Sequence, residues 1–546
     1  MIAAAAIVVF QELSCAGWGA LLLAALGLGR RLSPAERLCW AFSAGLGMLG
    51  WLVFWPGIAG HLAAPVLLGL LAAGLAGLPL LRPWGVLRLS RPGLTAIVLM
   101  VLIVIHAAMD GIEALSPPVD ADSLAYHFDL PRRFVEAGAI FFVPRAVDGA
   151  VPLLVQMTYV PAYAVGGGAS LGPWAVLTCW AGAVFLAVWA RRWLPGVWPL
   201  VLALLYLGAP AVIYGGGTGQ VETRLALFVL LSLAALGRWW REDDWRWLIL
   251  AGFAAGWFMA GKYTGMLFVA AVGLAVLLRH RRFLPLVVFG AAAMAMGTQW
   301  YVWNYVHSGD PVFPMLFKVL GPERVHFWNA EADALFRQVF LGVETPLPIT
   351  PWTLLSYPFQ ALLAPLPEFE AGRTGLGIVA LLLAPFALSA AWQRRSGLWG
   401  SPLMAVLLTL GGFYVLWFTL GGSQRVRHLV PVLPVTLLLS LAAAHAWATT
   451  SPRRRLLLAG LAAVLLAQAA GGAVAARWYV RMWGVGPEKY YGTTLGPYPV
   501  AAWANANLGK GEKLLNPYRE INYLLDVPFY HDHPVDQALV MRYPPH

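Results

Sequence analysis

The chain has 546 residues, of which 60% are hydrophobic and only 12% are charged. Soluble domains contain about a quarter charged residues, so this composition excludes a water-soluble globular protein and indicates an integral membrane protein. The formal net charge of +11 does not indicate nucleic-acid binding, because the arginines lie in short clusters between apolar runs, which is the pattern of membrane orientation.

A membrane span needs about 20 apolar residues to cross ~30 Å of hydrocarbon. The stretches that meet this requirement lie near 2–29, 38–57, 62–81, 94–112, 172–190, 197–214, 221–237, 283–301, 374–392, 402–420, 428–447 and 455–474. The apolar stretch 247–278 is too long for one comfortable helix and too short for two full spans.

Arginine clusters resolve this ambiguity. They fall in short loops near 30–37, 82–91, 191–192, 238–246, 279–282, 394–395 and 453–455. All these loops lie on one side only if 247–278 is a hairpin that turns near Gly261-Lys262, and the positive-inside rule makes that side cytoplasmic. We therefore expect an all-α polytopic bundle of about fourteen transmembrane helices, with both termini outside. Arginine far outnumbers lysine and alanine is abundant, which is typical of a GC-rich bacterial genome, so we expect a protein of the bacterial cytoplasmic (inner) membrane.

The long loops 113–171 and 302–373 are rich in acids and would face the exterior or periplasm, as would the tail. Segment 122–137 predicts short amphipathic helices at the membrane interface, and 152–168 predicts a loop helix that lies on the membrane. We divide the chain into an N-terminal three-span extension (1–93), a main transmembrane module (94–476) and a small cap (477–546). Within the cap we expect a helix at 498–508 and short strands at 513–516 and 521–525.

The segment DADSLAYH follows the span that ends near residue 112 and concentrates reactive side chains at the membrane surface. It contains two carboxylates two positions apart, Asp120 and Asp122, followed by Tyr126 and His127. An ordinary helix N-cap at Asp122 is the structural alternative. Glu222 stands at the outer start of an apolar span, where an ionisable group is costly and indicates a functional site; an interfacial acid paired with Arg224 is its alternative.

Cations occur at the same predicted face. Lys262 lies within apolar sequence between two short arms, so it needs a wet or anionic partner such as a lipid phosphate, unless it snorkels to the headgroups. Arg425 and Arg427 precede another span and could grip a phosphate through two donors each. Interfacial charge without a ligand is the alternative for these arginines.

In these residues the chain resembles the GT-C superfamily of membrane glycosyltransferases, particularly relatives of the protein O-mannosyltransferases and the lipid A aminoarabinose transferase. The resemblance covers roughly 94–530. It depends on the order and common outward placement of six strings: DADSLAYHFDLPRRFVEAG, VPLLVQMTYVPAYAVGG, TGQVETRLALFVLL, AGWFMAGKYTG, NYVHSGDPVFP and RVRHLVPVLPVTLLL. Two departures are the three additional N-terminal spans and a glutamate, Glu222, where relatives often have aspartate.

The resemblance implies an enzyme that transfers a sugar from a polyprenyl-phosphate donor to a glycan, lipid or protein acceptor on the outer face, with inversion. Asp122, or alternatively Asp120, would be the catalytic base, and Glu222 would be a further catalytic-site acid. The donor phosphate would be held by Lys262, Arg425 and Arg427. The side chains that orient the substrates would be Glu222, Tyr126, His127, Tyr263 and His428. A divalent cation on Asp120 and Asp122 stays an open alternative.

Elementary chemistry agrees with these roles. A phosphodiester is a good leaving group, so the reaction needs a base for the acceptor hydroxyl and cations for the departing phosphate, and no general acid. The alternatives are a transporter or flippase of lipid-linked glycans, an O-antigen ligase or polymerase, and an envelope scaffold. A transporter would not need acids concentrated at one face, a ligase would not depend on Asp122, and a scaffold would tolerate its loss.

Overall fold

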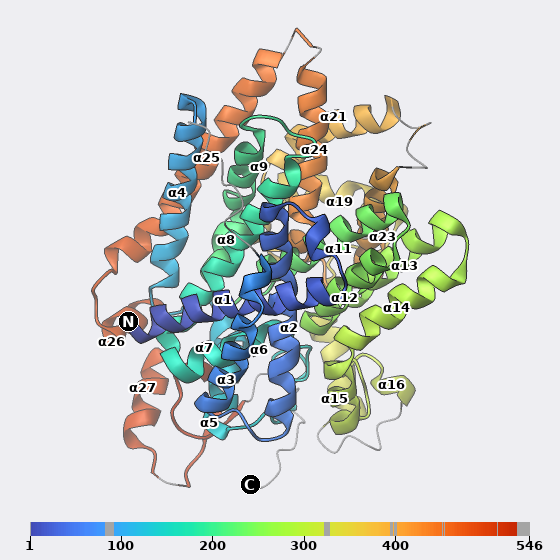
Figure 1. The fold of residues 1–546 in the computed structure, drawn as a ribbon. Helices are drawn as coiled ribbons and strands as arrows, with labels where there is room; N and C mark the ends of the chain where they lie inside the picture. Colours follow the sequence, from blue (N-terminus) through green and yellow to red (C-terminus); the bar gives the residue numbers. More distant parts are fainter. Residues whose placement is uncertain are drawn as a thin grey trace.

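The computed structural model describes residues 2–81, 92–320, 328–393, 397, 401–449, 451–452, 454–509 and 511–531. The expected all-α polytopic fold is confirmed (Figure 1). In these ranges, nine helical segments are long and apolar enough to cross a membrane. They are α1 (Ile2–Ala25), α2 (Pro34–Ile58), α3 with η2 (Ala64–Leu75 and Leu78–Leu81), α4 (Leu94–Ala114), η4 with α8 (Gly168–Ser170 and Leu171–Ala190), α11 (Glu222–Glu242), α23 (Pro402–Leu420), η8 with α24 (Val426–Val432 and Leu433–Ala448) and α25 (Arg454–Arg481).

Two further spans are broken. α9 (Trp198–Leu207) and α10 (Pro210–Gly216) are bent by 69°, and α14 (Phe283–Gly297) and α15 (Gln299–Ser308) by 62°. Pro210 begins α10 and has no N–H with which to continue the preceding helix, which accounts for the first break. Counting each bent pair as one span gives up to eleven in the described part of the chain.

The remaining predicted spans are helical but short. α12 (Trp245–Gly261) and α13 (Thr264–His280) have 17 residues each, and α21 (Val379–Gln393) has 15. At 1.5 Å per residue these helices reach ~22–25 Å, less than the ~30 Å of hydrocarbon. In the described part of the chain, up to eleven full-length spans and these three shorter helices thus occupy the fourteen predicted positions. The predicted hairpin within 247–278 is confirmed, since the chain turns between α12 and α13 at Lys262 and Tyr263.

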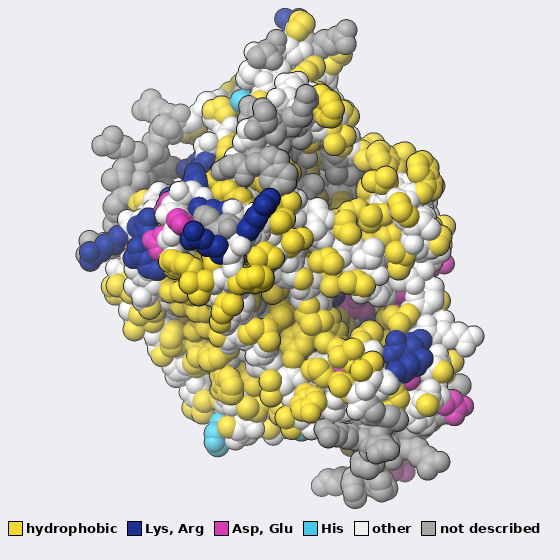
Figure 2. Space-filling view, turned by 90° about the vertical axis from the view of Figure 1, so that its right-hand side faces the viewer, with side chains coloured by type: hydrophobic (Ala, Val, Ile, Leu, Met, Phe, Trp, Pro, Cys, Tyr) yellow, Lys and Arg dark blue, Asp and Glu magenta, His cyan; other side chains and the backbone are white. Residues whose placement is uncertain are grey.

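Helix α11 forms the centre of the bundle. Of its apolar window 89% is buried, against 17% for α4 and α25 at the periphery (Figure 1). In the face shown in Figure 2, hydrophobic side chains cover the middle, and Lys and Arg side chains gather mainly toward its upper part. This distribution suits a protein whose outer helices contact lipid. The burial of α11 fixes Glu222, its first residue, in the interior.

The first long loop folds into the protein. It contains η3 (Ser123–His127), α5 (Asp129–Ala137), α6 (Leu154–Met157) and α7 (Tyr159–Gly166). The prediction that 152–168 lies on the membrane is wrong, because α6 packs against α2 and α7 against α1. The side chains of Leu154, Tyr159 and Val160 are at most 1% exposed. The apolar residues that indicated membrane contact are instead satisfied by the N-terminal helices.

The second long loop and the cap complete the structure. The loop contains α16 (Phe317–Leu320), α17 (Ala330–Leu335), η6 (Phe336–Leu341), α18 (Gly342–Glu344), α19 (Pro351–Leu363), η7 (Pro367–Phe369) and α20 (Ala371–Thr374). The cap contains α26 (Pro487–Thr494), α27 (Tyr498–Asn507), η9 (Arg519–Leu524) and two parallel strands, β1 (Leu514–Asn516) and β2 (Phe529–His531). The helix and first strand agree with prediction. The strand expected at 521–525 is wrong, since most of this segment forms η9.

Two arginines of α5 attach the cap to the first loop. Arg133 donates hydrogen bonds to the carbonyls of Asn522 (2.8 Å) and Leu525 (2.6 Å). Arg132 donates to the carbonyl of Tyr523 at 2.5 Å and pairs with Asp526. As a result η9 packs against η3, and the C-terminal segment lies directly over the acidic motif of the first loop.

Candidate active site

Asp122 is held between two arginines that are distant from it in sequence. Nη1 of Arg427 lies 2.6 Å from one carboxylate oxygen, and Nη2 of Arg519 lies 2.8 Å from the other. The same Arg519 nitrogen lies 2.8 Å from Asp148, whose side chain is fully buried. Arg427 comes from η8, at the entrance to α24, and Arg519 from η9 of the cap. Three separate parts of the chain thus meet at one carboxylate.

These contacts set the protonation state of Asp122. Burial alone would raise its pKa, but the positive charges of Arg427 and then Arg519 hold the pKa well below the usual value. Asp122 is therefore ionised at neutral pH, as a base must be before it accepts a proton. The tight pairing also lowers its basicity, so any ligand that draws the arginines away would strengthen it as a base.

Asp120 has a different environment from Asp122. It accepts hydrogen bonds from the backbone N–H and hydroxyl of Ser123, each at 2.8 Å, and from the Tyr214 hydroxyl. The amide of Gln220 lies between the two acids, 3.4 Å from Asp120 and 3.3 Å from Asp122. Asp120 thus joins η3 to the segment between α10 and α11. Its described hydrogen-bond donors are all uncharged, in contrast to the arginines on Asp122.

Glu222 forms an ion pair with Lys262, not with Arg224. Arg224 instead donates to the carbonyls of Gly215 (2.7 Å) and Gly216 (2.8 Å) at the end of α10, and so fixes the segment that carries Gln220. The Glu222 side chain is 5% exposed and that of Lys262 is 22% exposed. The sequence predicted a wet or anionic partner for Lys262, and in this structure the partner is a protein carboxylate.

His127 lies at the centre of these charges. Asp122, Glu222, Lys262 and Arg427 all perturb its electrostatic environment, but burial dominates and lowers its pKa from 6.5 to about 3. The ring is therefore neutral at physiological pH, and its Nδ1 lies 2.8 Å from the amide nitrogen of Gln156.

Tyr126 stacks on His127 with ring centroids 3.9 Å apart. Burial, and then the charges of Asp122 and Asp148, raise the pKa of Tyr126 well above its usual value, so this hydroxyl also stays neutral. Tyr126 and His127 can therefore exchange hydrogen bonds with a substrate but do not add charge to the site.

Three of the predicted residues have other contacts. Arg425 pairs with Glu344 and, at 2.6 Å, with Glu370, and reaches the cluster only indirectly, because Glu370 lies 3.7 Å from Arg427. The Tyr263 hydroxyl donates to the Ala150 carbonyl at 2.9 Å. His428 is 9% exposed and within electrostatic reach of Lys262, Arg427 and Asp122, but its side chain forms no hydrogen bond to these three residues.

The residues do not fit a divalent cation. Among the described residues, no group of three His, Cys, Asp or Glu side chains is arranged to bind a metal. Both oxygens of Asp122 already accept hydrogen bonds from arginines, and a cation next to two guanidinium groups would be repelled. The carboxylate of Asp122 is thus already paired with cations of the protein.

Sequence reasoning missed Arg519, Asp148, Gln220 and Gln156. Arg519 lies in a polar tail that has no span or motif to mark it, and it is 397 positions from Asp122. The two glutamines are buried polar residues in otherwise apolar segments, with exposures of 3% for Gln220 and 1% for Gln156. A glutamine in an apolar stretch can be recognised in the sequence as unusual, but it does not indicate which residue it contacts.

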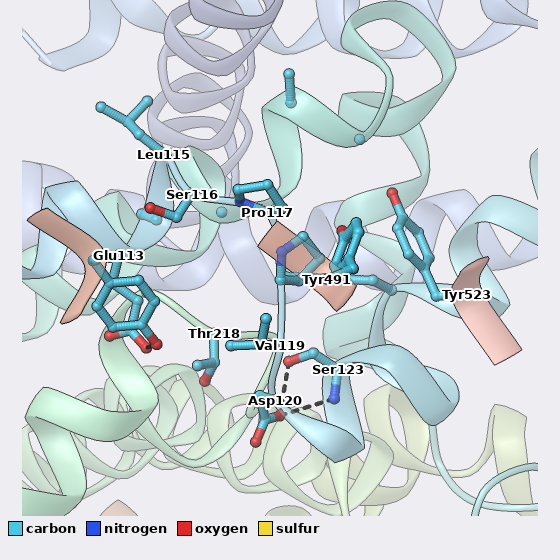
Figure 3. A pocket seen from close by; sticks show the side chains of 18 residues that line it. Glu113, Leu115, Ser116, Pro117, Val119, Asp120, Ser123, Thr218, Tyr491 and Tyr523 are labelled. Atoms are coloured by element: carbon cyan, nitrogen blue, oxygen red, sulfur yellow. Dashed lines mark hydrogen bonds between the residues drawn. The ribbon is translucent and has the colours of Figure 1, made fainter. Parts of the chain in front are cut away.

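A cavity of about 290 Å³ adjoins the Asp120 side of the cluster. Its wall includes Glu113 at the end of α4, Asp120 and three tyrosines, Tyr479, Tyr491 and Tyr523. Figure 3 shows Glu113 on one side, Tyr491 and Tyr523 on the other, and Asp120 with Thr218 between them. Within the DADS motif, Asp120 and Ser123 thus line the cavity, whereas Asp122 contacts the arginines.

A segment of the chain and its overall fold are similar to known proteins. Residues 169–305 match the family model described as dolichyl-phosphate-mannose-protein mannosyltransferase. The crystal structure of ArnT from Cupriavidus metallidurans bound to undecaprenyl phosphate is similar to this chain, with a TM-score of 0.52 and 14% identity over 81% of this chain and 86% of that chain. A search of curated proteins finds no match.

The fold and these similarities define the class: the chain is a polytopic all-α membrane protein with a GT-C-type fold. The resemblance to membrane glycosyltransferases, expected from the sequence motifs, is confirmed by both comparisons. The mannosyltransferase model covers α8 to α15, which includes Glu222 and Lys262. It does not cover Asp122, Arg427 or Arg519, whose roles depend on the geometry described above.

Proposed function

We propose that the chain is a glycosyltransferase that transfers a sugar from a polyprenyl-phosphate donor to an acceptor hydroxyl, with inversion, at the outer face of the membrane. The observation that carries this proposal is the pairing of a buried, ionised Asp122 with Arg427 and Arg519. A carboxylate base beside two phosphate-binding groups is the combination that displacement of a lipid phosphate requires. The ArnT complex with undecaprenyl phosphate shares the fold and supports the choice of donor.

In the proposed step, the acceptor hydroxyl attacks the anomeric carbon from the face opposite the phosphate, and Asp122 takes the hydroxyl proton. The bond between the anomeric carbon and the phosphate oxygen breaks, and its electron pair stays on polyprenyl phosphate. Arg427 and Arg519 hold the resulting negative charge. Because the donor phosphate competes with Asp122 for these arginines, donor binding raises the basicity of Asp122 just when a base is needed.

Glu222 and Lys262 have supporting roles in this proposal. Lys262 is 22% exposed, so it can contact the donor phosphate while Glu222 balances its charge. His127 and Tyr126, both neutral, orient a sugar or acceptor hydroxyl beside Asp122. Arg425, which is paired with Glu344 and Glu370, positions Arg427 through Glu370 and does not bind phosphate itself.

The charges at the two ends of α11 support the outward orientation. Glu222 begins the helix, and the other end holds an arginine-rich cluster that pairs with Glu36, Glu242 and Asp244. Arginine-rich loops lie preferentially on the cytoplasmic side. The Asp122 site would then face the periplasm of a bacterial cytoplasmic membrane, and its donor would approach from the outer leaflet.

The test uses the full chain in proteoliposomes with labelled undecaprenyl-phosphate sugars and a panel of glycan, lipid and peptide acceptors. We expect release of undecaprenyl phosphate together with a glycosylated product of inverted anomeric configuration, measured by NMR. Arg427→Gln should lose this activity, whereas Arg481→Gln, the same change at an exposed position on α25, should keep it. Transbilayer movement of intact donor without transfer would favour the flippase alternative and refute the proposal.

A further inference from the structure

The cavity beside Asp120 differs in chemistry from the arginine side of the site. Its 18 lining residues include two carboxylates, Glu113 and Asp120, and no Lys, Arg or His. A phosphate in this cavity would face the carboxylate of Asp120 without a cation to balance either charge. The donor phosphate therefore belongs with Arg427 and Arg519, and the cavity suits a ligand without negative charge.

The polar groups of the cavity wall are arranged to bind hydroxyl groups. Carboxylates accept hydrogen bonds, and tyrosine hydroxyls can both donate and accept. Tyr479 donates to Glu113 at 2.6 Å, which fixes this carboxylate at the wall. The Tyr491 side chain is only 8% exposed, and its hydroxyl has no hydrogen-bond partner among the described residues. Because Tyr491 lines the cavity, its hydroxyl can exchange a hydrogen bond with a ligand there.

The position of the cavity connects it to the transfer step. Asp120 lines the cavity, and Gln220 contacts both Asp120 (3.4 Å) and Asp122 (3.3 Å). The Gln220 side chain therefore links Asp122 to the cavity wall, and a ligand in the cavity would lie close to Asp122. The volume of about 290 Å³ lies at the lower end of the ~300–1,000 Å³ range of small-ligand sites, which suits a sugar unit better than a folded protein surface.

We propose that this cavity, between Glu113, Asp120 and the tyrosines Tyr479, Tyr491 and Tyr523, binds the acceptor, and that the acceptor is an uncharged carbohydrate. The proposal rests on the proposed transferase function and adds the class of acceptor to it. The carboxylates accept hydrogen bonds from sugar hydroxyls, and the tyrosine rings cover the apolar faces of the sugar. The DADS motif then separates two binding regions, a cationic one for donor phosphate and an acidic, aromatic one for acceptor.

The cap supplies part of the wall of this acceptor region. Tyr491 comes from α26 and Tyr523 from η9, and the hydrogen bonds from Arg132 and Arg133 hold this part of the cap in place. Removal of the cap would therefore open one wall of the cavity as well as remove Arg519. The tail thus supplies groups to both binding regions.

The experiment measures saccharide binding to the full chain in lipid nanodiscs by saturation-transfer difference NMR. The probes are methyl β-glucopyranoside, N-acetylglucosamine and, as the peptide alternative, a Gly-Ser-Gly amide. We expect the wild type to bind at least one saccharide. Glu113→Gln should weaken binding about tenfold, the effect of losing one hydrogen bond. Glu488→Gln, a matched change at an exposed position, should leave binding unchanged.

A second variant avoids any dependence on the buried acid. Ala169 lines the cavity but is exposed, so Ala169→Trp should fill the cavity without disturbing the core and abolish saccharide binding. Saccharide binding that both variants retain, binding of the peptide alone, or no binding by the wild type would each overturn the proposal. Binding is measured without a donor. Transfer without saccharide binding would therefore refute the acceptor site alone, and saccharide binding without turnover of any donor would refute the transferase function alone.

Discussion

Replacement of Arg519 by glutamine tests how the cap contributes to the site. One Arg519 nitrogen lies 2.8 Å from Asp122 and 2.8 Å from Asp148. The Arg519 side chain is 23% exposed and that of Asp122 is 11% exposed, so the pair is partly solvated. Its loss should cost less stability than the ~3–5 kcal/mol expected for breaking a fully buried ion pair. Arg132 and Arg133 would still hold the cap in place.

The expected effect on donor binding follows from the lost contact. A hydrogen bond to a charged group contributes ~1.5–3 kcal/mol, so Arg519→Gln should weaken the binding of undecaprenyl phosphate about 10- to 100-fold. The variant should also change the pH profile. Without the charge of Arg519, burial raises the pKa of Asp122 from its depressed value. Because the base must be deprotonated, the acid limb of kcat/KM moves to higher pH.

The assay measures the Kd for undecaprenyl phosphate and the pH dependence of transfer for the wild type, Arg519→Gln, Arg519→Lys and Arg481→Gln. Arg519→Lys keeps the charge and should move the acid limb less than glutamine does. Arg481→Gln removes an exposed arginine at the last residue of α25 and should have no effect. If Arg519→Gln bound donor like the wild type and kept its acid limb, the proposed role of the cap would be refuted.

Three further predictions concern the remaining groups of the site. Glu222→Gln should lower the thermal unfolding temperature more than a Glu222→Gln, Lys262→Met double variant, because the single change leaves a cation unpaired. His127→Gln should reduce the pH dependence of stability between about pH 6.5 and 3. In that range His127 is neutral in the folded state but protonated in the unfolded state, so the wild type loses stability as the pH falls. Unfolding curves measured at several pH values would show this difference. Arg425→Gln should lower stability through lost ion pairs while donor affinity falls far less than in Arg427→Gln; equal losses of affinity would contradict the assigned roles.

Much of the fold could be predicted because the spans are encoded locally. Apolar length and arginine placement located the helices, including the turn at Lys262 within 247–278. What failed has a common physical cause. The apolar segment 152–168 has the same composition whether it contacts lipid or protein, and only packing against α1 and α2 shows which. Likewise, the bend at Pro210 follows from the residue, but its angle depends on neighbouring helices.

In the candidate site, too, some features could be predicted from the sequence and others could not. Asp122, Glu222, Lys262 and Arg427 could be predicted because charge within or beside apolar sequence is costly and therefore informative. Their pairing could not, since the sequence suggested Arg224 for Glu222 and the structure gives Lys262. Arg519 lies in a polar tail where charge is ordinary. Its importance arises only because the cap folds back over η3.

The most direct test of the central claim compares sugar transfer by the wild type and by Asp122→Asn. Both proteins receive a labelled undecaprenyl-phosphate sugar in proteoliposomes, with Glu488→Gln as the matched amide substitution at an exposed site. Loss of a general base typically lowers the rate about 10²- to 10⁴-fold, so we expect Asp122→Asn to fall into that range while it still binds undecaprenyl phosphate. Transfer by Asp122→Asn at the wild-type rate would contradict the assignment of Asp122 as the base.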